Sequence, residues 1–339
     1  MSKTKDTTKP THLQKTKKEE KSIDTRNLKL TYSDGTKAVN GISLQIPKGE
    51  FFGFLGPNGA GKTTFIKMLV TLLNPTSGKA KVNGYSLKKQ PQVIRETIGY
   101  MAQETNVDGE LTARENIRFA CEAYGVPKKK REKRINELLE LVELSDVANK
   151  RVKGYSGGMK KRLDVATALV HEPPLVFLDE PTTGLDPKSR KKLWDYFERI
   201  NAEGRTIFLT TQYLEEADQL CDRIAVIQEG EIISTGSPTK LKQKVGGHIL
   251  EISFDGDKQK KKAAEIAKKT NIYDDTKVDF TEKGIKVAAE KNQISGAALL
   301  VELQENNLPI KGFNLHEPTL NDVFLTITGK KIKDKKEEK

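Results

Sequence analysis

The stretch Gly56-Pro-Asn-Gly-Ala-Gly-Lys-Thr-Thr64 has the residue types and the spacing of a phosphate-binding loop. It follows the apolar run 51–55 and precedes the apolar-rich run 65–70, which predicts a strand, a glycine loop and a helix. Glycines let backbone N–H groups turn inward, and the helix presents the positive end of its dipole to an anion. In this pattern Lys62 reaches the β- and γ-phosphates of a nucleotide, and Thr63 ligates Mg²⁺. The strand and helix around the loop argue against an ordinary glycine turn.

A pair of acids supplies the second carboxylate that a metal-dependent phosphate site needs. Asp179 and Glu180 end the apolar run 175–178, 117 residues after Lys62. Asp179 is placed to hold the metal directly or through water, and Glu180 to polarise the attacking water. Two acids after a strand would, by themselves, more often be helix capping. Paired with the loop, they predict a site for nucleotide hydrolysis.

A second anion site is predicted where Ser156, Gly157 and Gly158 precede the helical stretch 160–170. A hydroxyl, free backbone N–H groups and a helix dipole together favour a bound anion. One chain does not need two γ-phosphate sites for one nucleotide. Two copies arranged head to tail, however, could each close the site of the other.

The elements around these residues predict an α/β fold. The apolar segments 23–30 and 42–46, with a turn near residues 33–36, indicate antiparallel strands. A mostly helical stretch at 111–170 interrupts the strand pattern and indicates an inserted helical subdomain. Short apolar runs that alternate with helices indicate a parallel sheet with helices on both faces; these runs are 175–178, 206–211 and 223–227.

The chain changes character at Val245. The pattern from there predicts strands at 248–254, 277–280, 284–289 and 309–315, helices at 258–269 and 294–305, and a last helix from Thr319 to Ile327 stopped at Gly329. The order β-α-β-β-α-β is the ferredoxin-like split pattern. Because this part has no phosphate loop or ligand cluster, we interpret it as a structural or regulatory accessory domain.

Charge and composition limit the other classes of protein. The net charge of +12 owes +4 to residues 1–22 and +3 to residues 330–339, two lysine-rich ends that read as disordered tails. The basicity therefore argues only weakly for nucleic acid. No apolar run reaches the roughly 18 residues of a membrane-spanning helix, so we expect a soluble cytoplasmic chain. The two cysteines and four histidines are scattered and predict neither a disulfide nor a metal cluster.

Residues 23–240 resemble the ATP-binding cassette family, with several motifs in the family's order. The resemblance implies a P-loop nucleoside triphosphatase cassette, with a mixed sheet core and a helical subdomain at about 104–170, followed by a small α+β ferredoxin-like domain at 245–329. It also implies that Tyr32 stacks on adenine, that Gln103 links the metal site to a membrane partner, and that Asp186 communicates across a dimer. Expected nucleotide contacts are Tyr32, Gly56, Pro57, Asn58, Gly59, Ala60, Gly61, Lys62, Thr63, Thr64, Gln103, Ser156, Gly157, Gly158 and Asp186; expected metal ligands are Thr63, Gln103 and Asp179.

Two positions depart from the family pattern. The signature motif has Tyr155 and Met159 where leucine and glutamine are usual, but its Ser-Gly-Gly is intact. The family's switch histidine is replaced by Gln212, which can donate a hydrogen bond to the γ-phosphate but cannot become a cation. The resemblance therefore implies three catalytic residues, Lys62, Glu180 and Gln212.

The motifs at 182–186, 209–218 and 318–325 resemble the ATPase subunits of daunorubicin-type multidrug exporters. The resemblance implies an ATP- and Mg²⁺-dependent ATPase that dimerises around two ATP molecules. It would drive a separate membrane permease, at the inner face of the cell membrane, to export drugs or other amphipathic compounds. One alternative is an ATPase switch acting on the ribosome or nucleic acid, which only the lysine-rich ends favour. Another is a non-hydrolysing regulatory half, which only Gln212 favours.

Overall fold

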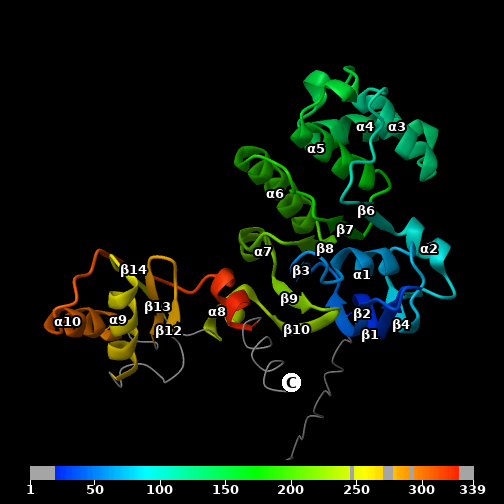
Figure 1. The fold of residues 1–339 in the computed structure, drawn as a ribbon. Helices are drawn as coiled ribbons and strands as arrows, with labels where there is room; N and C mark the ends of the chain where they lie inside the picture. Colours follow the sequence, from blue (N-terminus) through cyan, green and yellow to red (C-terminus); the bar gives the residue numbers. More distant parts are fainter. Residues whose placement is uncertain (1–19, 245–247, 270–277, 290–293, 328–339) are drawn as a thin grey trace, which may run out of the picture.

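The structure is a computed structural model that describes residues 20–244, 248–269, 278–289 and 294–327. Its centre is a six-stranded sheet in the order β10-β9-β3-β8-β7-β6 (Figure 1). Five neighbouring strands of this sheet are parallel, and β10 pairs antiparallel with β9 at the edge. Their bounds are β3 Phe51–Leu55, β6 Ile98–Met101, β7 Leu175–Asp179, β8 Thr206–Thr211, β9 Arg223–Gln228 and β10 Glu231–Gly236.

A second, antiparallel sheet has the order β2-β1-β4-β5. It consists of β1 Lys21–Thr31, β2 Lys37–Pro47, β4 Ser77–Val82 and β5 Tyr85–Ser86. The predicted hairpin is confirmed, and the Asp34 carboxylate accepts a hydrogen bond from the Thr36 N–H (2.9 Å) within its turn. The predicted tail 1–22 is wrong at its end: Lys21 and Ser22 belong to β1, because the buried Ser22 hydroxyl bonds that of Thr206 (2.7 Å).

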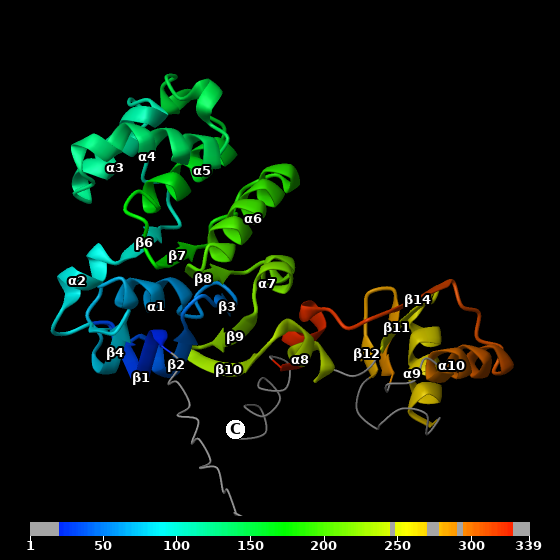
Figure 2. The same cartoon turned by 180° about the vertical axis from the view of Figure 1, so that it is seen from behind.

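Strictly alternating side chains give the six-stranded sheet a core on each face. On one face, Phe52 and Phe54 of β3 pack with the antiparallel sheet, with α1 (Lys62–Leu69) and with α2 (Pro91–Glu96). On the other, Phe51 and Leu55 join α6 (Pro187–Ala202) and α7 (Leu214–Leu220). Helices do cover both faces, but an antiparallel sheet shares one of them, as both views show (Figures 1 and 2).

The helical insertion consists of α3 (Ala113–Ala123), α4 (Lys128–Leu141), two short 3₁₀ turns (Ser145–Val147 and Val152–Gly154) and α5 (Gly157–Ala168). Thr112 and Glu115 form a capping box at the start of α3. Ser156 caps α5 by accepting a hydrogen bond from the Met159 N–H (3.3 Å). Across the described parts of the chain, no helix is both long enough and apolar enough to cross a membrane.

The C-terminal sheet has the order β12-β13-β11-β14 with every neighbouring pair antiparallel, which confirms the ferredoxin-like prediction. After α8 (Pro238–Gln243) come β11 His248–Ser253, α9 Asp257–Lys269, β12 Val278–Phe280, β13 Gly284–Ala289, α10 Ile294–Glu305 and β14 Gly312–His316. The last strand starts three residues later than predicted. The predictions for residues 1–19, Lys277, Gly329 and 330–339 lie outside the described residues.

The last described helix spans residues 320–327 and contacts both the C-terminal sheet and the rest of the chain. On one side, the Asp322 carboxylate accepts hydrogen bonds from the Thr319 N–H and hydroxyl (2.7 Å each) and pairs with Lys286 of β13. On the other, Leu320 and Val323 enter the apolar core that also holds α6 and α7. This helix therefore connects the C-terminal sheet to the central one (Figure 2).

We expect Gly99→Ala to destabilise the fold by about 1–3 kcal/mol, because a Cβ on β6 would lie 2.4 Å from the Ala168 carbonyl oxygen at the end of α5. Gly154→Ala is the matched control, since an added Cβ there meets nothing within 4 Å. Urea unfolding of both variants checks this. Equal midpoints for the two variants would contradict the close approach of β6 and α5.

Candidate nucleotide-binding site

The loop 56–61 joins β3 to α1, as the sequence predicts. Gly61 is the N-cap of α1 and has φ 103, a left-handed conformation that favours glycine. A Cβ at Gly61 would lie 2.2 Å from the Ala38 carbonyl oxygen, and one at Gly56 would lie 2.5 Å from that of Ile227. Strands β2 and β9 thus approach the loop so closely that Gly56 and Gly61 cannot be replaced by residues with a Cβ atom.

Lys62, the first residue of α1, bends its side chain back across this loop. Its ammonium donates to the carbonyls of Gly56 (2.8 Å) and Pro57 (3.2 Å) and forms a 3.0 Å ion pair with Glu180. The Lys62 side chain is only 4% exposed. A buried cation in this position faces the anion that the loop's N–H groups are shaped to bind.

Asp179 ends β7 and Glu180 follows it; one strand, β8, separates β7 from β3. The Asp179 Oδ1 accepts hydrogen bonds from the hydroxyls of Thr63 (3.2 Å) and Thr210 (2.5 Å). Burial raises the pKa of Asp179, and these two hydrogen bonds oppose the rise. The structure therefore brings together the phosphate-loop threonine and both predicted acids.

The oxygen ligands of Thr63 and Asp179 fit a hard divalent cation. The second carboxylate oxygen of Asp179 is buried and has no hydrogen-bond partner within the described structure. An unpartnered buried carboxylate oxygen beside a threonine hydroxyl is the donor set that a metal ion would satisfy. Gln103, a third residue predicted at the metal, donates its amide N–H to Glu180 (3.1 Å).

Glu180 has φ 48, which is uncommon for a residue with a side chain. Its backbone N–H donates to the carbonyl oxygen (3.0 Å) and the hydroxyl (3.1 Å) of Thr210 on β8, which hold this conformation. The turn directs the carboxylate toward Lys62 and Gln103. Local strain of this kind is typical of a residue whose direction serves a site.

The second anion site lies away from the first within one chain. Ser156, Gly157 and Gly158 begin α5 in the helical insertion, which both views show apart from α1 (Figures 1 and 2). A Cβ at Gly158 would lie 2.8 Å from the Ser189 hydroxyl, which itself donates to Asp186 (2.6 Å). The signature residues and Asp186 are therefore neighbours; Ser156, Gly157 and Asp186 are exposed, whereas Gly158 is buried.

Tyr32 lies at the end of the first strand, next to the start of α1. Its hydroxyl is 3.2 Å from that of Thr64, and the residue is 41% exposed. An exposed aromatic ring beside the phosphate loop is placed to stack on a base.

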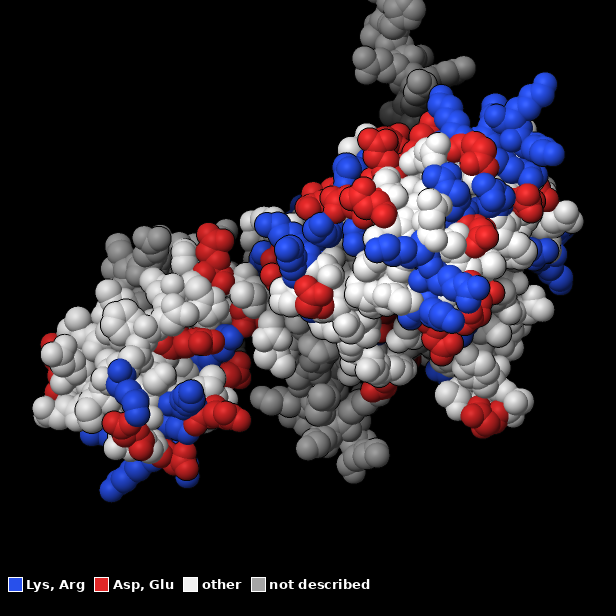
Figure 3. All heavy atoms as spheres, turned by 90° about the horizontal axis from the view of Figure 1, so that it is seen from above, with Lys and Arg blue, Asp and Glu red and all other residues white. Residues whose placement is uncertain are grey.

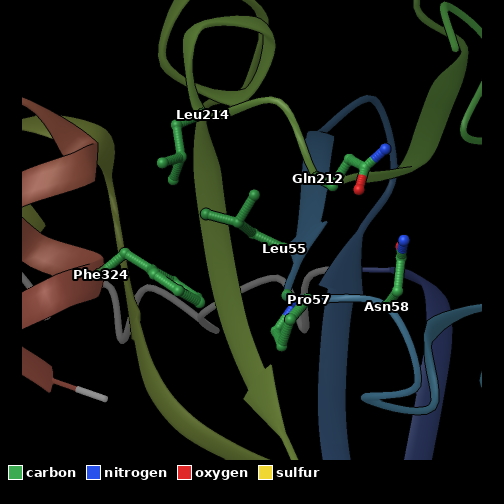
Figure 4. A pocket seen from close by; sticks show the side chains of 7 residues that line it. Leu55, Pro57, Asn58, Gln212, Leu214 and Phe324 are labelled. Carbon is green, nitrogen blue, oxygen red and sulfur yellow. The ribbon is translucent and has the colours of Figure 1, made fainter. Parts of the chain in front are cut away.

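Gln212 lines a hollow of about 210 Å³ at the base of the phosphate loop. Figure 4 shows Gln212 and Asn58 at one end of it and Leu214 and Phe324 at the other. Phe324 belongs to the last helix, so the C-terminal part of the chain reaches the immediate surroundings of the site. No motif of the nucleotide loop indicated that Phe324 shares this hollow with residues 55–58, because they lie more than 260 positions apart in the sequence.

Sequence reasoning missed three buried charged residues that support the site. The Glu216 carboxylate of α7 accepts hydrogen bonds from Thr182 (2.9 Å) and Trp194 (3.0 Å), and burial raises its pKa. Lys161 and Asp164 of α5 are also buried. The available signal was a charged residue within an otherwise apolar helix face, as in Leu163-Asp-Val-Ala166.

Two family models match the chain. The model described as "ABC transporter" matches residues 39–183, and the model described as "ATP-binding protein DrrA1-3-like, C-terminal domain" matches residues 236–328. The first match contains the phosphate loop, the signature residues and both acids. The second begins near the end of β10 and covers the C-terminal sheet and the last helix.

The chain is similar to several characterised proteins over nearly its whole length. It is 39% identical to the daunorubicin/doxorubicin resistance ATP-binding protein DrrA of Streptomyces peucetius, covering 94% of this chain and 96% of that protein. It is 36% identical to the linearmycin resistance ATP-binding protein LnrL of Bacillus subtilis, covering 92% and 100%. It is also 36% identical to a Nod factor export ATP-binding protein I of Rhizobium, covering 92% and 98%.

Similar solved structures cover the central part of the chain. A dimeric post-hydrolysis state of the ATP-binding cassette MJ0796 bound to ADP and Pi has 28% identity and a TM-score of 0.59, covering 63% of this chain and 98% of that one. The cbiO1 subunit of a Clostridium perfringens ABC transporter complex has 29% identity and a TM-score of 0.62, covering 67% and 94%. Both support the cassette fold.

We expect Gln212→Ala to lower ATP turnover on the order of 100-fold, because a hydrogen-bond donor to the developing phosphate charge is lost. Gln212→His should lose less, since imidazole also donates. Gln219→Ala, an exposed glutamine on α7, is the control. Phosphate release measures all three, and equal turnover of wild type and Gln212→Ala would exclude a role for the amide.

We expect Asp164→Asn to stabilise the chain increasingly as the pH rises from about 4 to about 7. Burial raises the pKa of Asp164 to about 6 against the pull of the Asn106 N–H and the Lys161 charge, so the folded chain holds a proton that the unfolded chain releases. The stability that the protonated Asp164 contributes to the wild-type chain is therefore present at low pH and is lost as the pH rises through about 6. The free energy of unfolding should differ by up to about 3 kcal/mol at pH 8, by urea titration. A pH-independent difference would contradict the buried charge.

Proposed function

This chain belongs to the ABC transporter family as one of its ATP-binding subunits, and we propose that it hydrolyses ATP as a dimer of two such cassettes. The observation that carries the proposal is the separation of the two anion sites within one chain. Ser156 caps an exposed helix N-terminus far from its own phosphate loop, so a second copy placed head to tail would close each site. The dimeric MJ0796 structure, similar to this chain, supports that arrangement.

In the proposed reaction, water attacks the γ-phosphate in line, and each residue of the site has one task. Glu180 orients the water and accepts its proton, because its constrained turn directs the carboxylate into the site. Lys62 neutralises charge that develops on the phosphate oxygens. Gln212 of the same chain and Ser156 of the partner chain donate hydrogen bonds to the γ-phosphate. Tyr32 holds the base, and the loop N–H groups hold the phosphates.

We assign the Mg²⁺ site to Thr63 and Asp179. Their oxygens meet at the carboxyl end of β7, and one buried oxygen of Asp179 has no partner among the described residues. When bound, Mg²⁺ would neutralise phosphate charge and fix the geometry of the leaving group. Gln103 would complete the site through its amide oxygen, while its N–H donates to Glu180.

The permease and the transported compound are inferred from the relatives. DrrA and LnrL are named for resistance to daunorubicin, doxorubicin and linearmycin, and the Rhizobium relative for export of Nod factor. We infer that this chain powers a separate membrane permease, from the inner face of the cell membrane, that exports amphipathic compounds. In this arrangement 23–240 is the ATPase domain, with β1 extending it to residue 21, and 245–329 is the accessory domain.

Among the residues that the structure describes, no specific observation favours the alternative of an ATPase switch acting on the ribosome or nucleic acid. On the face shown in Figure 3, Lys and Arg side chains are interspersed with Asp and Glu. This face therefore offers no extended field of one sign to a polyanion.

We expect Glu180→Gln to retain ATP and to slow turnover at least about 100-fold, because the amide cannot accept the proton of the attacking water. With ATP bound and unhydrolysed, the variant should accumulate as a dimer. Glu215→Gln, an exposed glutamate on α7, is the control and should behave as wild type.

Phosphate release and size-exclusion chromatography with ATP are the measurements. A variant with wild-type turnover would remove Glu180 from the role of base. A variant that binds ATP but stays monomeric would remove the dimer from the mechanism.

A further inference from the structure

The segment that leaves β6 carries Gln103 and then enters the helical insertion at Thr112. Two buried charged residues of α5 bind the backbone of this segment. The Lys161 ammonium donates to the Gln103 carbonyl oxygen, and the Asp164 carboxylate accepts a hydrogen bond from the Asn106 N–H (3.1 Å). Lys161 and Asp164 are 7% and 4% exposed.

The two side chains act on the same segment because they lie three residues apart on one helix. Residues at i and i+3 share a face, and this face of α5 is directed toward the segment 103–107. One residue fixes a carbonyl and the other an N–H, so both kinds of free backbone group in the segment are held. Apolar residues could fill this core, but they would not bind these two backbone groups.

The segment is also tied to the insertion further on. The Asp108 N–H donates to the Asn116 side chain of α3 (2.8 Å), whose amide returns a hydrogen bond to the Asp108 carbonyl (3.0 Å). The Val152 N–H donates to the Leu111 carbonyl (2.9 Å). From Gln103 to Leu111, therefore, repeated hydrogen bonds join the segment to the insertion.

The Gln103 side chain points the other way, into the hydrolysis site. It donates to Glu180, and Glu180 pairs with Lys62. A continuous series of contacts thus runs from α5 through Lys161, the Gln103 backbone and the Gln103 amide to the base and the phosphate-loop lysine. The same α5 begins at Ser156, the residue that would bind the nucleotide of a partner chain.

We propose that Lys161 and Asp164 are positioning residues that make the segment 103–107 move with α5. They would hold Gln103 at Glu180 when Ser156 engages the partner's nucleotide. The proposal rests on the dimer proposed above. It adds that closure at one site is transmitted through α5 to the other nucleotide's base within the same chain. Lys161 and Asp164 touch neither nucleotide nor water in this role.

Burial of these charges has a cost that supports a role beyond packing. Removing a carboxylate and an ammonium from water is unfavourable, and burial raises the pKa of Asp164 and lowers that of Lys161. An apolar pair would fill the same space without that cost. The hydrogen bonds that these charged residues form with the segment 103–107 offset that cost.

The experiment compares two variants that remove the tether with two that preserve it, in the full-length chain. Lys161→Met and Asp164→Ala remove a donor and an acceptor, whereas Lys161→Arg and Asp164→Asn keep them. Lys160→Met, the same change one residue earlier on α5, is the control. The measurements are kcat, ATP affinity, and amide hydrogen exchange of residues 103–107 and 157–168.

We expect Lys161→Met and Asp164→Ala to lower kcat about 10-fold and to change ATP affinity less than about 2-fold, since the phosphate loop is untouched. Exchange should accelerate in 103–107 and stay unchanged in 157–168. Lys161→Arg and Asp164→Asn should keep kcat within about 3-fold of wild type. Because both residues hold one segment, their effects on kcat should not multiply. The kcat of the Lys161→Met, Asp164→Ala double variant should be at most about 3-fold lower than that of the slower single variant.

Wild-type kcat together with faster exchange in 103–107 would overturn the proposal. So would a parallel loss of kcat, ATP affinity and protection of α5, which would indicate a purely structural role; Lys161→Arg and Asp164→Asn then decide whether the hydrogen bonds or the volume matter. Dimerisation of Glu180→Gln with ATP is measured alongside. If that variant fails to dimerise, the proposed function fails. If it dimerises while Lys161→Met and Asp164→Ala keep wild-type kcat, only the positioning role fails.

Discussion

The structure depends on keeping one cation and two carboxylates together in a buried place. Lys62, Asp179 and Glu180 have almost no contact with solvent, and isolated charges in such a place would be strongly destabilising. The parallel sheet solves this by ending β3 and β7 on either side of β8, whose Thr210 donates to the Asp179 carboxylate and accepts a hydrogen bond from the Glu180 backbone N–H. Each of the three charges then has a partner, and their shared site faces the phosphate loop.

The glycine loop and the strained turn at Glu180 follow from the same constraint. Gly56 and Gly61 let β2 and β9 approach so closely that the loop cannot collapse away from Lys62. Thr210 holds the left-handed backbone of Glu180, which turns its carboxylate inward. The tightly packed sheet therefore stabilises a backbone conformation at Glu180 that the local sequence would not adopt alone.

The helical insertion and the last helix both bring distant parts of the chain to this site. The insertion does so through Lys161 and Gln103, and the last helix through Phe324, which lines the same hollow as Gln212. That helix is anchored to the C-terminal sheet by the Asp322–Lys286 ion pair. Two otherwise separate parts of the fold thus contact the residues around the phosphate loop.

Short-range patterns determined much of this protein from sequence alone. The loop 56–64, the acids at 179–180, the Ser156 cap and the order of the C-terminal strands depend on residue type and periodicity, which are local properties. Residue 21 lies in a strand whose Ser22 bonds Thr206, and Gln103 bonds Glu180 after the end of β7. In both cases the partner is more than 70 positions away in the sequence. Lys161, Asp164, Glu216 and Phe324 read as ordinary helix residues in the sequence. Only tertiary packing gave them roles, because burial and hydrogen-bond partners across the fold do not follow from local spacing.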